Sequence, residues 1–240
     1  MVDLRSGVEN MIADSTRDNP WHLFPHARPF VLEHDLPAIC SFNQKFDPRF
    51  HYDLNLHPEP FIGSLSAPII LLALNPGLSE RDYEVHSDEH LLGTIRNSAV
   101  QSPLCTQFYY LTEAFSSTPG GEWWRSKLRR LIDDLGLEAV SPAMCRIQLY
   151  PYHSREFHSI PEVTSTVLHV RQVLLDQFRL GKLIIVMRAW RQWTSLVPEL
   201  LDYERVVRLR NPRNPCLSPG NLGDSYEMVR QAISRTSCIG

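Results

Sequence analysis

Polar and cationic side chains follow four apolar runs of this sequence, and their types could support chemistry on one ligand. Asn75-Pro76-Gly77 follows the first run, Gln148 ends the second, Arg188 ends the third and Arg210 ends the fourth. A side-chain amide offers a donor and an acceptor, and a guanidinium group binds phosphate in a fixed geometry. A cationic rim on a chain of formal net charge −3 therefore suits a phosphate-bearing ligand.

The elements that must position these residues alternate between strands and helices. Short apolar runs predict strands over residues 68–74, 143–150, 182–188 and 203–210, and apolar residues at helical spacing predict helices over residues 122–135, 161–180, 189–201 and 225–233. We therefore expect an α/β fold, a three-layer α/β/α domain over residues 67–240 with a four-stranded parallel sheet. Ligands of such sheets bind beyond the carboxyl ends of the strands, where the four polar positions lie.

The N-terminal part of the chain shows weak periodicity. Residues 1–66 are rich in Pro, His and Asp, which predicts an irregular extension that wraps the domain and holds a short helix over residues 36–46. The stretch from residue 79 to 122 predicts only one helix, near residues 106–115. Because the N-terminus lacks the apolar core of a signal peptide and no apolar run is long enough to cross a bilayer, we expect a cytoplasmic protein without a membrane partner.

The cysteines are widely spaced in the sequence. None of the five cysteines forms a close pair, which argues against a cysteine metal site and favours reduced thiols. His86 and His90 have a spacing that chelates a metal on a helix, but the residues between them do not predict a helix and two ligands are too few. We therefore expect neither a metal nor a cofactor.

The strand ends carry three short motifs. Ala73-Leu74-Asn75-Pro76-Gly77 ends the first strand, Gln148 with Pro151 after it ends the second, and Leu209-Arg210-Asn211 followed by Pro212-Arg213-Asn214-Pro215 ends the fourth. On these strands and in this order, they resemble the uracil-DNA glycosylase superfamily, in particular its single-strand-selective and mismatch-specific branches. The segment Gly121-Glu122-Trp123-Trp124 also looks like the start of a family helix. The resemblance covers roughly residues 68–235.

The chain departs from the family pattern at three positions. Ala73 replaces the glycine of Gly-x-Asn-Pro-Gly, Gln148 replaces the asparagine that binds the base edge, and Leu209 replaces the histidine of His-Pro-Ser. The resemblance implies that Asn75 orients the attacking water and that Gln148 reads the base edge.

The missing histidine leaves the cationic donor to be supplied by Arg210, Arg213 or His153. Asn75, His153 and Arg210 are therefore the expected catalytic residues. Tyr150 or Tyr152 would stack on the base, and Arg188 would contact phosphate. The expected substrate-binding residues are Pro76, Gly77, Gln148, Tyr150, Tyr152, Arg188, Asn211, Arg213 and Asn214.

Three functions fit these residues. The first is a DNA base glycosylase-like hydrolase that cleaves the N-glycosidic bond of a modified, damaged or mismatched base. The second is a catalytically inactive domain of the same fold that binds nucleic acid, with DNA as the first expectation, or a nucleotide. The third is a different small-molecule enzyme on a similar sheet, because a fold does not fix a function. The oligomeric state stays open.

Overall fold

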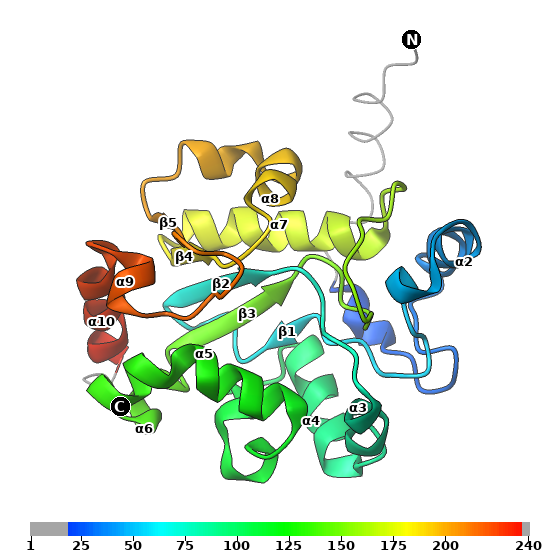
Figure 1. Cartoon of the computed structure of the whole chain (residues 1–240), viewed down its shortest axis with the longest axis horizontal. Helices are drawn as coiled ribbons and strands as arrows, with labels where there is room; N and C mark the ends of the chain where they lie inside the picture. Colours follow the sequence, from blue (N-terminus) through cyan, green and yellow to red (C-terminus); the bar gives the residue numbers. More distant parts are fainter. Residues whose placement is uncertain (1–18, 237–240) are drawn as a thin grey trace.

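A computed structural model describes residues 19–236 of the chain and has one central sheet (Figure 1). Its five strands lie in the order β1-β3-β2-β4-β5. They are β1 (Phe61–Ile62), β2 (Ile69–Ala73), β3 (Met144–Gln148), β4 (Leu183–Val186) and β5 (Val206–Arg208). The pairs β2–β3, β2–β4 and β4–β5 are parallel, so their carboxyl ends meet at one edge of the sheet.

The prediction of an α/β fold is confirmed, but the prediction of a four-stranded parallel sheet is wrong. The sheet has a fifth strand, β1, which pairs antiparallel with β3 through Phe61–Ile147 and Ile62–Arg146. This strand has only two residues, Phe61 and Ile62, both fully buried, and so short a run carries no period-2 pattern. It lies within residues 1–66, so the expected boundary after residue 66 divides strands of a single sheet.

Helices flank the sheet on two sides. In Figure 1, α7 and α8 are drawn on one side of the strands, and α4 and α5 on the other. The α-helices are α2 (Leu36–Lys45), α3 (Glu80–Val85), α4 (Glu89–Ala99), α5 (Pro119–Leu135), α6 (Leu137–Val140), α7 (Ser165–Arg179), α8 (Trp190–Leu196), α9 (Pro219–Leu222) and α10 (Ser225–Thr236). The 3-10 helices are η1 (Pro20–Leu23), η2 (Pro48–Phe50), η3 (Tyr109–Leu111), η4 (Glu113–Phe115) and η5 (Pro198–Leu201).

Local capping sets the ends of the two longest helices. The Thr118 hydroxyl oxygen accepts a hydrogen bond from the Gly121 amide at 3.0 Å, and Gly136, at φ +84°, ends α5. Thr164 caps α7 in the same way, by accepting from the Val167 amide at 3.3 Å. α7 begins at Ser165, four residues after the start of the predicted helix over residues 161–180, because Thr164 caps it there.

Other predicted helices were wrong in part. The segment near residues 106–115 forms the 3-10 helices η3 and η4 rather than one α-helix, and the predicted helix over 189–201 ends at Leu196, before Pro198 begins η5. The helices α3 and α4 lie in residues 79–105, for which no helix was predicted. Asp88 caps α4 by accepting from the His90 amide at 2.8 Å. The aspartate is a helix-start signal in the sequence, but the polar residues after it hide the apolar pattern of the helix.

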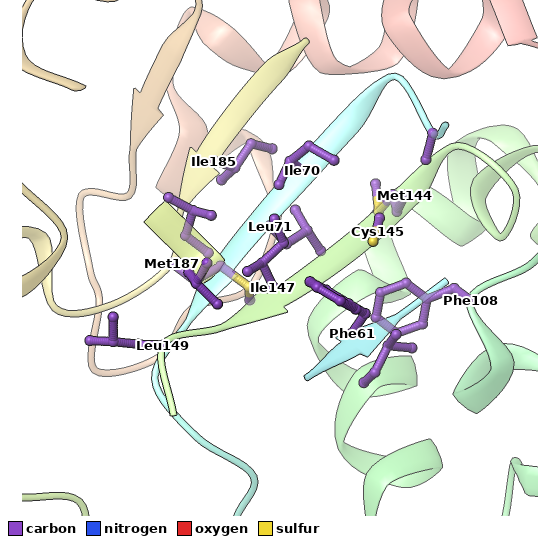
Figure 2. Packing of buried hydrophobic residues seen from close by; sticks show 14 of the residues in the cluster. Phe61, Ile70, Leu71, Phe108, Met144, Cys145, Ile147, Leu149, Ile185 and Met187 are labelled. Carbon is purple, nitrogen blue, oxygen red and sulfur yellow. The ribbon is translucent and has the colours of Figure 1, made fainter. Parts of the chain in front are cut away.

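The core lies between the sheet and its helices. Figure 2 shows Ile70, Leu71, Ile147 and Ile185, from three neighbouring strands, among the buried residues on the two faces of the sheet. Burial of such aliphatic side chains contributes about 1.5–3 kcal/mol each. The strands are thereby held in a fixed register, which fixes the positions of the loops that leave their carboxyl ends.

Two further expectations concern the described residues. Cys40, Cys105, Cys145 and Cys216 are free thiols, while Cys238 lies outside the described part of the chain. Among residues 19–236, no helix has the length and the apolar character that crossing a membrane requires.

Candidate active site at the carboxyl ends of the strands

A cavity of about 430 Å³ lies where the strands end. The loops after β2, β3 and β4 line it, together with the start of α5. The lining includes Glu59, Asn75, Pro76, Gly77, Asp82, Tyr110, Trp123, Arg146, Gln148, His153, Ser154 and Arg188. This volume is within the range of small-molecule sites, and the position is the one expected for a ligand of a parallel sheet.

The loops after β2 and β3 are joined by hydrogen bonds. The Asn75 side-chain amide donates to the Ser154 hydroxyl at 2.8 Å and to the Pro76 carbonyl at 2.8 Å. The Ser154 backbone amide donates to the Pro76 carbonyl at 3.3 Å. Both donated bonds of Asn75 are thus used within the protein, so its side-chain oxygen is the atom left to accept a hydrogen bond from a ligand or water.

Gln148 places an unsatisfied amide at the cavity. The residue is 1% exposed, and its side-chain oxygen has no hydrogen-bond partner in the described part of the chain. A buried polar atom without a partner costs about 1–3 kcal/mol. A ligand that donates to this oxygen would recover that energy, so the cavity favours a ligand with a polar edge over an apolar one.

Trp123 and Arg188 form one wall of the cavity. The Arg188 guanidinium lies 5.9 Å from the centre of the Trp123 ring, and its Nε is buried without a partner. Burial lowers the pKa of Arg188, although an arginine stays charged at neutral pH. The wall therefore offers an aromatic surface and a cationic donor side by side.

A cluster of charged groups lies on another side of the cavity and centres on Glu59, which is 2% exposed. The Tyr110 hydroxyl donates to Glu59 Oε1 at 2.6 Å, and Arg146 lies 3.4 Å from Oε2. His86 Nε2 and His153 Nε2 lie 3.4 Å and 3.7 Å from Oε1. We call these five residues the Glu59 cluster.

The electrostatics of the cluster favour an ionised Glu59 and a neutral His153. Burial by itself raises the pKa of Glu59, but the hydrogen bond from His86 and the charges of His153 and Arg146 outweigh it and lower that pKa to about 2. Burial lowers the pKa of His153, as does His86, against the opposing charges of Glu59 and Asp82. Desolvation disfavours every charge here, but Glu59 has enough partners to stay ionised, and Arg146, as an arginine, stays charged as well.

The segment before β1 delivers Glu59 to the site. The Glu59 amide donates to the Pro151 carbonyl at 2.9 Å, and the Asp53 amide donates to the His153 carbonyl at 2.8 Å. The segment that we expected to wrap the domain irregularly thus supplies Glu59, the one carboxylate among the five residues of the Glu59 cluster. Glu59 and Arg146 were not predicted as site residues. An arginine inside the apolar strand Met144–Gln148 was the available signal, because a buried charge requires a partner.

Six of the expected site residues come together at the cavity. They are Asn75, Pro76, Gly77, Gln148, His153 and Arg188. His153 also donates from Nδ1 to the Gly77 carbonyl, with the two atoms 2.7 Å apart. Asn75, Gln148 and Arg188, from three different strand ends, therefore share one cavity as expected.

The two expected stacking residues lie elsewhere. Tyr152 is 1% exposed, and its hydroxyl donates to Asp35 at 2.9 Å; Tyr150 is buried and bonds the Ile160 carbonyl at 3.4 Å. Neither ring lines the cavity. The aromatic ring beside Arg188 at the cavity is that of Trp123, which comes from α5.

The residues after β5 also lie away from the cavity lining. Arg210, Asn211, Arg213 and Asn214 are exposed, and of this loop only Pro215 lines the cavity. Asn221 holds the loop by accepting from the Asn211 amide at 2.6 Å and donating to the Cys216 carbonyl at 3.0 Å. β5 is only three residues long, so the chain turns before it reaches the cavity.

The pair His86 and His90, considered in sequence as chelating on a helix, is separated by the fold. His86 follows α3 and is buried in the Glu59 cluster, whereas His90 lies exposed in the first turn of α4. Residues 86–88 are not helical and separate α3 from α4, so the two rings lie in different surroundings.

The cavity as a whole combines an amide acceptor, an unpaired buried amide, an aromatic wall, the Glu59 carboxylate and the His153 imidazole. Such a set can hold a planar polar ligand, orient a water molecule and supply positive charge. A comparison with protein-family models, one with curated proteins and one with solved structures each found no match for this chain.

Proposed function

We propose that this chain is a DNA base glycosylase-like hydrolase with a three-layer α/β/α fold of the uracil-DNA glycosylase type, and that it works on DNA in the cytoplasm. The observation that carries the proposal is the buried, unpartnered side-chain oxygen of Gln148 in a cavity at the strand ends. A nucleobase has the planar shape and the polar edge that such an amide binds. Three motifs on the strand ends resemble the same family.

The proposed reaction is hydrolysis of the bond between a base nitrogen and C1′ of its deoxyribose. The base turns out of the stack, and Gln148 hydrogen-bonds its edge while Trp123 packs against its face. As the C–N bond breaks, its electron pair moves to the base nitrogen and C1′ gains oxocarbenium character. Water adds its oxygen to C1′ and loses one proton, and the departing base anion gains one.

Asn75 orients the water in this proposal. Its side-chain nitrogen is held by Ser154 and Pro76, so its oxygen accepts a hydrogen bond from water in a fixed direction. An amide is a weak base, which suits a leaving group that is already stable as an anion. Arg188, with its unpaired Nε, stabilises negative charge on the base or on a neighbouring phosphate.

The direct experiment uses oligonucleotides that carry uracil, hypoxanthine or a modified pyrimidine, followed by cleavage at abasic sites. We expect one of these substrates to yield abasic sites, and Asn75→Ala and Gln148→Leu each to lower the single-turnover rate about 10²-fold or more. Arg205→Ala is the matched control, because Arg205 is exposed and precedes β5 at the opposite edge of the sheet.

The inactive binding domain remains the second candidate, favoured by the exposed position of Arg210 and by Leu209 at the position of the family histidine. It predicts binding of single-stranded DNA that weakens steeply with salt, with no abasic sites on any substrate. Absence of both cleavage and DNA binding would refute both candidates and favour a small-molecule enzyme.

A further inference from the structure

Three side chains of the Glu59 cluster are of the types that bind transition metals. One ligand atom from each of Glu59, His86 and His153 lies within 4.8 Å of the other two, and all three residues are buried. They come from three separate segments: the residues before β1, the end of α3 and the loop after β3. Convergence of such residues from distant segments is unlike the exposed acidic clusters that occur on protein surfaces.

His153 is held with one nitrogen ready to ligate. Its Nδ1 lies 2.7 Å from the Gly77 carbonyl oxygen, which can only accept, so Nδ1 carries the proton. Nε2 then bears a lone pair, and it is buried without a hydrogen-bond partner, 3.7 Å from Glu59 Oε1. A metal-bound histidine has this same arrangement, with its other nitrogen donating to a carbonyl.

The spacing of the ligand atoms suits a metal ion. A tetrahedral ion with bonds of about 2.1 Å keeps its ligand atoms about 3.4 Å apart. His86 Nε2 and His153 Nε2 lie 3.4 Å and 3.7 Å from Glu59 Oε1.

Neighbouring groups complete the surroundings of the three ligands. Tyr110 donates to Glu59 Oε1 at 2.6 Å, and Arg146 lies 3.4 Å from Oε2, so the carboxylate is fixed by donors as ligating carboxylates commonly are. His86 Nδ1 accepts from the His57 amide at 3.3 Å. Ligation through Nε2 moves the His86 proton to Nδ1, so this long hydrogen bond is lost when a metal binds.

We propose that Glu59, His86 and His153 bind one divalent transition-metal ion, with Zn²⁺ as the favoured ion. Two imidazoles and one carboxylate favour Zn²⁺ over Mg²⁺ or Ca²⁺, which prefer oxygen ligands. Three protein ligands leave a fourth position open, as in catalytic zinc sites. Because Glu59 and His153 line the cavity, that position is reached from the cavity.

The charge of the site indicates what would occupy the fourth position. Arg146 already balances Glu59, so a divalent ion adds two positive charges that no other cluster residue cancels. An anion or a hydroxide from the cavity would then be the favoured fourth ligand. Metal binding itself does not depend on the proposed glycosylase activity, so the two ideas succeed or fail separately.

The test measures binding of Zn²⁺ and Co²⁺ to the full chain after treatment with a chelator. We expect one equivalent of Zn²⁺ by isothermal titration calorimetry, and intense visible absorption with Co²⁺, which marks four-coordinate geometry. His153→Ala and His86→Ala should each weaken the affinity at least about 100-fold. His90→Ala is the matched control and should bind as wild type does, because His90 lies exposed outside the cluster.

Folding of each variant is checked by circular dichroism. If a variant does not fold, its affinity is replaced by a second measurement on the wild type. In thermal unfolding of the wild type, Zn²⁺ should raise Tm more than the same concentration of Mg²⁺. No stoichiometric binding to wild-type protein would overturn the proposal, as would unchanged affinity in folded His153→Ala protein or equal loss in His90→Ala protein.

Discussion

Removal of the hydroxyl of Tyr152 should destabilise the protein through a single buried carboxylate. Asp35 is fully buried and accepts from the Tyr152 hydroxyl at 2.9 Å. It also accepts from the amide and the hydroxyl of Ser165, both at 2.7 Å, and from the Thr166 hydroxyl at 2.7 Å. Asp35 therefore anchors the start of α7 and the loop that carries the neighbouring His153.

The contacts set the expected magnitudes. Tyr152→Phe removes the hydrogen bond to the charged Asp35 and the 3.3 Å bond from the Leu32 amide, which together cost about 2 kcal/mol. Asp35→Ala leaves several buried donors without a partner and removes negative charge from the start of α7, which costs about 4 kcal/mol. In the Asp35→Ala background the same tyrosine substitution loses only its 3.3 Å contact with the Leu32 amide and should cost about 0.5 kcal/mol.

The assay is urea unfolding followed by far-ultraviolet circular dichroism for the wild type, both single variants and the double variant. The difference between the two backgrounds gives a coupling energy of about 1.5 kcal/mol. Tyr83→Phe is the matched control. The Tyr83 hydroxyl also bonds an aspartate, Asp53, but on the surface, so its loss should cost less than about 0.5 kcal/mol.

Additive costs in the double variant would refute the reasoning, because they would mean that the tyrosine and the carboxylate do not interact. A loss for Tyr152→Phe as small as that for Tyr83→Phe would refute it as well. In that case burial would not strengthen this hydrogen bond, and the coupling between α7 and the loop after β3 would need another origin.

Three further predictions concern a histidine pKa, two helix glycines and a buried thiol. Burial lowers the pKa of His169 to about 4; the unfolded chain therefore takes up this proton first, and His169 by itself should lower the free energy of unfolding by up to about 3 kcal/mol between pH 6.5 and pH 4. Urea titrations of His169→Gln should show a fall smaller by about that amount, because the lowered pKa values of His57 and His153 still contribute. Gly93→Ala in α4 meets open space and should raise stability by about 1 kcal/mol, whereas Gly121→Ala places its Cβ against the Phe115 carbonyl and should lower Tm. The thiol of Cys145 is fully buried, and burial raises its pKa, so mass spectrometry should find it unmodified after native alkylation and modified after unfolding.

Part of the fold was predictable because apolar runs report burial directly. The runs that became β2 and β4 are short and continuously apolar, and strands buried on both faces have that pattern. The run that became β3 is apolar apart from Arg146 and Gln148. β1 was not predictable, since Phe61 and Ile62 form too short a run to show a period. Phe61 and Ile62 form a strand because the edge of β3 is otherwise unpaired and the chain runs along it. This pairing depends on the tertiary structure and not on a local pattern.

The candidate site shows the same division. Asn75, Gln148 and Arg188 were found because each ends a readable strand, and the carboxyl ends of parallel strands meet. Tyr152 and Arg210 follow strands too, but their loops turn them elsewhere. Sequence spacing does not show how a loop turns, so Tyr152 and Arg210 were predicted as site residues together with Asn75, Gln148 and Arg188.

What the sequence by itself determined is the set of parallel strands and the edge at which their polar ends gather, because periodicity and strand direction are local properties. Only the tertiary structure decided that Glu59 reaches this edge from the segment before β1 and that His86 and His153 meet it there. Burial of a carboxylate depends on partners supplied by distant segments, and no local pattern in the chain encodes that meeting.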